Sequence, residues 1–174
     1  MRAVLKGGRL GAWPWLALVL LVLIVPPLSA ESDAVLAARL QAAVAADAQL
    51  ASSGAAVSLT VAEGRVRLSG TVRLYRDKLA YERIVRGVAP GVAVLDEVRV
   101  EPLMPAADRD IERAIVSLGK LNRFQGAEFQ IAVTAGAVRV RGLFLDPHDV
   151  LFLIEQLAAL EGVRAIEIDA LFPV

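Results

Sequence analysis

Two stretches of the chain repeat one pattern of hydrophobic and polar positions. Residues 58–72 (SLTVAEGRVRLSGTV) align without a gap with residues 130–144 (QIAVTAGAVRVRGLF), at an offset of 72 residues. In each stretch, two runs that alternate apolar and polar residues flank a glycine, Gly64 or Gly136. Such alternation around a glycine predicts a β-hairpin with one buried face. A repeat of this length predicts two copies of one small domain.

The glycines of the repeat are predicted to serve the backbone rather than a ligand. Gly64 and Gly136 are expected to supply the positive φ of a two-residue turn. Gly70 and Gly142 lie within strands, where a missing side chain is typical of a bulge or of close backbone approach. The glycine spacing of a phosphate-binding loop does not occur in the sequence.

In the first copy the pattern predicts the order helix, strand, strand, helix, strand. Asp33 is expected to cap a helix whose apolar residues Leu36, Leu40 and Val44 recur at helical spacing. The remaining predicted elements are strands at 57–61 and 65–72, a helix at 75–88 and a strand at 92–100.

The second copy repeats this order. Asp108 or Asp110 is expected to open its first helix. Asp146 fits the N-cap of its second helix, with Pro147 at the first helical position. That helix is expected to run to about residue 160. Strands are predicted at about 129–134, 137–144 and 164–171.

These elements predict an α+β fold with two domains, at residues 31–103 and 106–174. Each domain is expected to be an αββαβ two-layer unit, a three-stranded mixed sheet with two helices on one face. Pro102 and Pro105 mark the linker. About seventy residues is near the lower limit for an independent core, so some packing between the copies is expected.

Residues 1–30 have the pattern of a secretory signal peptide. Basic residues come first, an apolar run from Leu16 to Val25 follows, and the small residue Ala30 precedes the expected cleavage point. The apolar run is short for a membrane span, although an uncleaved amphipathic or tilted anchor is the alternative. The expected location is the bacterial periplasm.

The absence of cysteine and the net charge exclude some kinds of anchor and binding partner. The chain has no cysteine, which excludes a disulfide framework and a lipoprotein anchor. Without the first thirty residues it keeps 16 basic and 19 acidic residues, a formal net charge of −3. This balance gives no support to nucleic-acid binding.

The sequence predicts no catalytic, cofactor-binding or metal-binding residue, and no small-molecule substrate is evident. His148 is the only histidine, and it is expected to lie exposed in the first turn of a helix. No serine lies in a recognisable nucleophile elbow. Asp96 and Glu97 are interpreted as solvated charges at a strand edge. We therefore expect a protein that is not an enzyme and holds no cofactor.

The second helices of the two copies differ in the residues that face away from the predicted core. Where the first copy has charged residues, the second has apolar ones, and a helix that is apolar nearly all round is buried on more than one side. The first copy, another chain or a membrane surface could each cover this side. The predicted interaction residues are Val150, Leu151, Ile154 and Ala158.

The corresponding helix of the first copy has a basic side that could attract anionic lipid head groups. Glu82 lies among these basic residues, so an ordinary solvated helix face is the simpler interpretation. The residues of the possible head-group site are Arg76, Lys78, Arg83 and Arg86.

The two copies resemble the BON family, named after bacterial osmotic-shock and nodulation proteins. The likeness is carried by residues 64–72 with Gly91-Val92, and by residues 136–142 with Gly162-Val163. The resemblance implies a periplasmic, non-enzymatic binding protein that engages membrane phospholipid or another envelope protein and supports envelope integrity. The alternative is a ring-building subunit of a secretion-type assembly, whose modules have a similar order of helices and strands.

Overall fold

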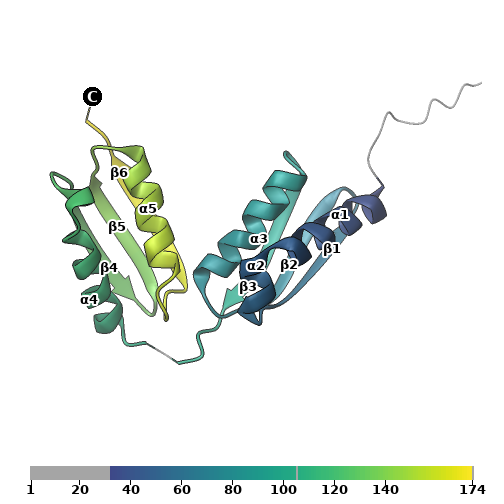
Figure 1. Ribbon diagram of the computed structural model, residues 1–174, viewed down its shortest axis with the longest axis horizontal. Helices are drawn as coiled ribbons and strands as arrows, with labels where there is room; N and C mark the ends of the chain where they lie inside the picture. Colours follow the sequence, from purple (N-terminus) through teal and green to yellow (C-terminus); the bar gives the residue numbers. More distant parts are fainter. Residues whose placement is uncertain (1–31, 105, 174) are drawn as a thin grey trace, which may run out of the picture. The chain divides into compact units, whose positions relative to one another are not determined.

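The computed structural model describes residues 32–104 and 106–173, which form two three-stranded sheets with helices (Figure 1). The expected signal peptide therefore lies outside the described residues. The mixed α+β architecture and the repeated unit are those predicted from the sequence. No described helix is long and apolar enough to cross a membrane.

The first unit contains three helices and three strands. Its central strand β2 pairs antiparallel with β1 and parallel with β3, and α3 makes the crossover that a parallel pair requires. In order, the elements are α1 (Asp33–Ala46), α2 (Ala48–Ser53), β1 (Ala56–Ala62), β2 (Arg65–Val72), α3 (Tyr75–Val88) and β3 (Ala93–Val100).

The second unit has the same topology and the same register. Arg65 pairs with Ala93 in the first sheet, and Ala137 pairs with Ala165 in the second, which preserves the 72-residue offset. The elements are α4 (Asp108–Gly119), the 3₁₀ turn η1 (Asn122–Phe124), β4 (Glu128–Thr134), β5 (Ala137–Leu143), α5 (Pro147–Ala158) and β6 (Ala165–Leu171).

Both hairpins turn through two residues in the left-handed region, as the two-residue turn with positive φ predicts. Glu63 and Gly64 have φ of 53° and 68°, and Ala135 and Gly136 have φ of 50° and 79°. The carboxylate of Asp108 accepts hydrogen bonds from the N–H groups of Ala135 and Gly136, at 2.8 and 2.9 Å. The turn of the second unit is thus held by the start of its first helix.

The prediction that Asp33 caps the first helix is wrong. Ser32 is the N-cap and its side chain accepts from the Val35 N–H, while Asp33 is the first helical residue. The Asp33 carboxylate instead accepts from the Gly64 N–H at 3.0 Å. Asp33 therefore does in the first unit what Asp108 does in the second, and in both units the two partners lie far apart in the sequence.

Gly70 and Gly142 mark close backbone approach, which confirms their structural interpretation. A Cβ at Gly70 would overlap the carbonyl group of Ala56 on the neighbouring strand. At Gly142 it would overlap the carbonyl oxygen of Glu128 and the Cα of Phe129. Any larger residue at these two positions would push β1 from β2, or β4 from β5.

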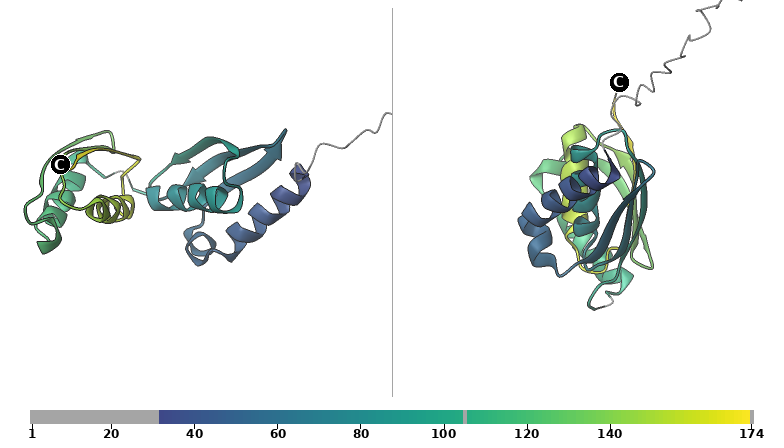
Figure 2. Two further views of the ribbon diagram at one scale, coloured as in Figure 1. Left: turned by 90° about the horizontal axis from the view of Figure 1, so that it is seen from above. Right: turned by 90° about the vertical axis from the view of Figure 1, so that its right-hand side faces the viewer.

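Each sheet buries one face under its helices and leaves the other face open (Figure 2). The first core gathers side chains such as Leu40, Leu68 and Val85, all from the first unit. The second core contains stacked Phe129 and Phe144 rings, with centroids 5.5 Å apart. The alternating strands predicted from the sequence thus have one buried and one exposed row.

Candidate binding surfaces

The basic side of α3 is matched by carboxylates. Each of the four predicted head-group residues has a carboxylate oxygen within 4 Å. The pairs are Arg76–Asp77 (3.8 Å), Lys78–Asp96 (3.1 Å), Arg83–Asp47 (3.6 Å) and Arg86–Glu82 (2.9 Å).

Lys78 is the least available of these four. Its Nζ donates to the Val98 carbonyl oxygen at 2.9 Å as well as pairing with Asp96, so it fastens α3 to β3. Asp96 is therefore a half-buried partner of α3 rather than a solvated edge charge. Glu97, its neighbour, lies on the opposite face of the sheet and pairs with Arg67. The two carboxylates do not form a site together.

Burial is the main cause that raises the pKa of Glu82 above its ordinary value. A side-chain hydrogen bond with Asp96 and the negative charge of Asp96 act in the same direction. Arg86 and Lys78 oppose the shift with weaker effects.

The predicted interaction residues of α5 differ widely in exposure. Leu151 is 59% exposed, whereas Val150 and Ile154 are half-buried. Ala158 is 1% exposed and lies among buried atoms. Leu151 is therefore the member of this set that is available at the surface.

Further exposed apolar side chains lie at the end of the second unit where β5 and β6 stop and α5 begins. Leu143 and Leu171 are register partners on these two strands, and Leu171 is 60% exposed. Leu145, in the loop before α5, is 56% exposed, and Phe172 after β6 is also exposed. We call Leu143, Leu145, Leu171 and Phe172 the apolar end. Leu151 is exposed on α5, in the helix layer, and is not counted with them.

The first unit has polar or basic residues at three of the equivalent positions. With the offset of 72, Leu143, Leu145 and Leu171 correspond to Thr71, Arg73 and Arg99. Because the two sheets share one register, this comparison is between equivalent places in the fold. The apolar side chains at these three positions are thus a property of the second unit, whereas the counterpart of Phe172 is the buried Val100. Sequence comparison of the strands and loops at this offset would have found them.

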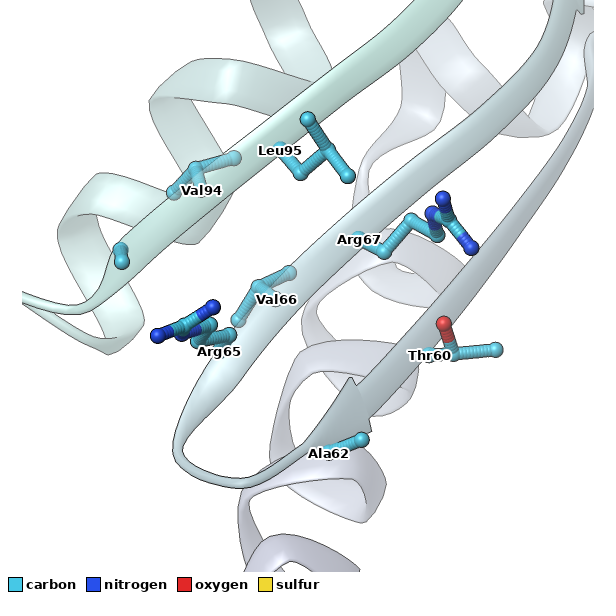
Figure 3. Close-up of a pocket in the computed structure, with 8 residues that line it drawn as sticks. Thr60, Ala62, Arg65, Val66, Arg67, Val94 and Leu95 are labelled. Carbon is cyan, nitrogen blue, oxygen red and sulfur yellow. The ribbon is translucent and has the colours of Figure 1, made fainter.

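The open face of the first sheet contains a shallow hollow of about 500 Å³. Arg65 and Arg67 project from β2, with Leu95 on β3 and Thr60 on β1 (Figure 3). Arg67 pairs with Glu97 at 3.1 Å, but Arg65 has no carboxylate within 4 Å among the described residues. We call this place the arginine hollow.

The equivalent place in the second sheet carries a balanced charge. Arg65 is replaced by Ala137, and Leu95 by Glu167. Glu167 then pairs with Arg139, the counterpart of Arg67, at 2.8 Å. The next arginine along, Arg141, pairs with Asp169, also at 2.8 Å.

His148 lies exposed in the first turn of α5, as expected for it. Asp146 is the N-cap, and its carboxylate accepts from the His148 N–H and lies 2.8 Å from the His148 Nδ1. These hydrogen bonds lower the pKa of Asp146, the one from the backbone N–H contributing most. No group of three or more acidic or histidine side chains that could hold a metal occurs among residues 32–104 and 106–173.

Comparison with known proteins gives one family match. The model of the BON domain matches residues 32–102. A search of curated proteins found no match.

Two solved structures are similar over most of the chain at low identity. One is the C-terminal domain of CdsD, the structural protein of the type III secretion system of Chlamydia trachomatis. It is 14% identical with a TM-score of 0.33, and the match covers 81% of this chain and 67% of that one. A second CdsD structure is 12% identical, with the same TM-score and coverage of 81% and 64%.

Proposed function

We propose, on the premise of the BON-domain match to residues 32–102, that this chain is a non-enzymatic binding protein of the cell envelope that engages a membrane phospholipid surface. The signal-peptide pattern of residues 1–30 supports export to the periplasm. Engagement of the membrane in turn supports a role in envelope integrity.

The observation that carries this proposal is the apolar end of the second unit. Leu145 and Leu171 are each more than half exposed, and Leu143, the register partner of Leu171, lies with Phe172 at the same end of the second sheet. Contiguous exposed apolar side chains mark protein or membrane interaction sites. Full burial of one leucine contributes about 1.5–3 kcal/mol, so a few of them suffice to hold a small domain at an interface.

Vesicle co-sedimentation of the protein from Glu31 to Val174 tests the proposal. We expect binding to phosphatidylcholine vesicles that contain phosphatidylglycerol, and a loss of about tenfold in affinity for Leu145→Glu or Leu171→Glu. Ala137→Glu introduces the same charge at an exposed position at the other end of the same sheet. That control should bind like the unaltered protein.

Two results would overturn the proposal. The unaltered protein could fail to sediment with these vesicles, which would move the search to an envelope protein partner. Alternatively, the leucine variants and Ala137→Glu could bind equally well, which would remove the apolar end from the contact. Circular dichroism of each variant checks that the fold is retained.

A further inference from the structure

We propose that the arginine hollow on the open face of the first sheet binds a phosphate group. The site lies on the first unit and uses no residue of the apolar end, so the inference goes beyond the proposed function. The phosphate could belong to a lipid head group or to a soluble phosphate ester. The chemistry of recognition is the same for both.

The geometry of β2 brings two guanidinium groups to one side of the sheet. Arg65 and Arg67 are two residues apart on a strand, so both lie on the open face, about 6.6 Å apart along the strand. Figure 3 shows the two guanidinium groups directed away from each other, Arg65 toward β3 and Arg67 toward β1, so both can contact one anion only after a change of side-chain rotamer. The planar fork of a guanidinium matches phosphate oxygens with two parallel hydrogen bonds. Thr60, the register partner of Arg67, adds a hydroxyl donor beside it.

The charges around the hollow leave Arg65 available to an anion and hold Arg67 only in an exposed ion pair. Arg65 has no carboxylate within 4 Å among the described residues, and Glu63 in the adjoining turn forms no ion pair with it. Arg67 pairs with Glu97, but both side chains are well exposed. Ion pairs of this kind stabilise by only about 0–1 kcal/mol, so a phosphate can displace Glu97. With Arg99 included, the strand positions of this face have an excess of two positive charges.

An apolar shelf adjoins the cationic part of the hollow. Leu95 is 50% exposed and lines the hollow together with Ala62 and Ala93. A bare inorganic anion gains nothing from this shelf, whereas the carbon chain of a phosphate ester can pack on it. We therefore expect a phosphate ester to bind more tightly than inorganic phosphate.

The second sheet supplies an internal control for the site. It has the same register, yet Ala137 stands at the position of Arg65 and Glu167 at that of Leu95. Arg139, the counterpart of Arg67, forms an ion pair with Glu167 at 2.8 Å. The phosphate site should therefore be present in the first unit and absent from the second.

A nuclear magnetic resonance titration of ¹⁵N-labelled protein tests the inference, with inorganic phosphate, glycerol phosphate and acetate as probes at constant ionic strength. We expect phosphate and glycerol phosphate to shift the amide resonances of Arg65, Arg67 and Leu95, and acetate to shift them less. Arg65→Ala, which copies the second unit, should weaken glycerol phosphate binding about fivefold to tenfold. Arg139→Ala should leave it unchanged.

Vesicles of phosphatidylcholine with phosphatidylglycerol then distinguish the source of the phosphate. If Arg65→Ala also weakens vesicle binding, the ligand is a lipid head group; if vesicle binding is unchanged, the ligand is a soluble phosphate ester. Leu145→Glu should weaken vesicle binding without altering the glycerol phosphate titration, which separates this site from the proposed function. Equal shifts at Arg139, or an acetate response equal to that of phosphate, would overturn the inference.

Discussion

Asp108 joins two parts of the second unit that lie far apart in the sequence. Its carboxylate accepts two N–H groups of the hairpin turn, one from Ala135 and one from Gly136. Ala135 has a φ of 50°, a conformation that costs a residue with a side chain about 1 kcal/mol or more. The two hydrogen bonds offset this and fix the start of β5 against α4.

Removal of the Asp108 carboxylate should therefore destabilise the second unit. We expect Asp108→Ala to lower the free energy of unfolding by about 1–2 kcal/mol, because two turn N–H groups lose their acceptor. Asp110→Ala, an exposed acidic residue in the same helical turn, is the matched control and should have a smaller effect. Urea denaturation of the two variants measures the difference, and equal losses would contradict this role of Asp108.

Part of this residue-level structure follows from the sequence and part does not. Gly70 and Gly142 were predicted to mark a bulge or close backbone approach, because a glycine inside an alternating strand is typical of both, and the structure shows close approach. Asp33 was predicted as a cap because a carboxylate before a helix has that role locally. Its acceptor role for Gly64 depends on a contact between distant parts of the chain, which local pattern does not reveal.

An ion pair and a hydrogen bond join α3 to β3, in addition to the apolar side chains of the core. Lys78 binds both Asp96 and the Val98 carbonyl oxygen, and Glu82 lies beside Asp96 on the same side of the helix. Burial and the negative charge of Asp96 disfavour the ionised form of Glu82. The pKa of Glu82 is therefore higher in the folded state than in the unfolded chain.

This shift predicts how Glu82 affects stability with pH. Because the folded state binds the proton more tightly, ionised Glu82 destabilises the fold at neutral pH, and the penalty disappears as the pH falls below the unfolded pKa. Glu82→Gln keeps a hydrogen-bond donor for Asp96 without the charge. It should raise the thermal midpoint at pH 7 and give no advantage near pH 4.

Arg86→Gln serves as the control for this experiment, because it removes the ion-pair partner of Glu82 while retaining the carboxylate. It should lower the thermal midpoint at pH 7 rather than raise it. A Glu82→Gln variant that is less stable than the unaltered protein at pH 7 would show that the pair with Arg86 outweighs the burial.

Long helices, in which the apolar residues recur over several turns, were well predicted, and short helices were not. The helix at 75–88 was predicted with the bounds of α3, because its apolar positions recur over four turns. The six-residue α2 and the turn η1 are too short to show a period. Phe124 of η1 is buried because its ring packs edge-on against Phe129, with centroids 5.8 Å apart, a contact between residues of different elements.

Each unit has its own buried core. The buried residues of the first core all lie between Leu36 and Val100, and those of the second between Ile111 and Val163. A domain of about seventy residues with one such core is near the lower limit for folding alone. The family match to residues 32–102 covers the whole first core.

We therefore predict that residues 31–103 fold without the second copy. The isolated fragment should show dispersed amide resonances, with slow hydrogen exchange at the buried residues of β2, such as Val66 and Leu68. The spectrum should overlay on the corresponding resonances of the longer protein. A fragment that gives the narrow dispersion of an unfolded chain would show that the first core depends on the second copy.

The binding surfaces were harder to predict than the fold. The exposed Leu151 was identified because an apolar residue on the outer side of a helix breaks its pattern. The arginine hollow was missed because Arg65 and Arg67 occupy the polar positions of a regular strand. Their significance appears only once the register shows that Ala93 is the partner of Arg65 and Leu95 the partner of Arg67, so that no carboxylate pairs with Arg65.

The shared register has a consequence for how such a duplicated protein can diversify. Gly70 fixes the register of β1 against β2, and Gly142 fixes the same register of β4 against β5. Every outward position of one copy therefore has a defined counterpart in the other. The inward rows must keep a packed core, whereas the outward rows can change side chains without disturbing it. The outward side chains of one copy can therefore change without altering either the core or the outward side chains of the other copy.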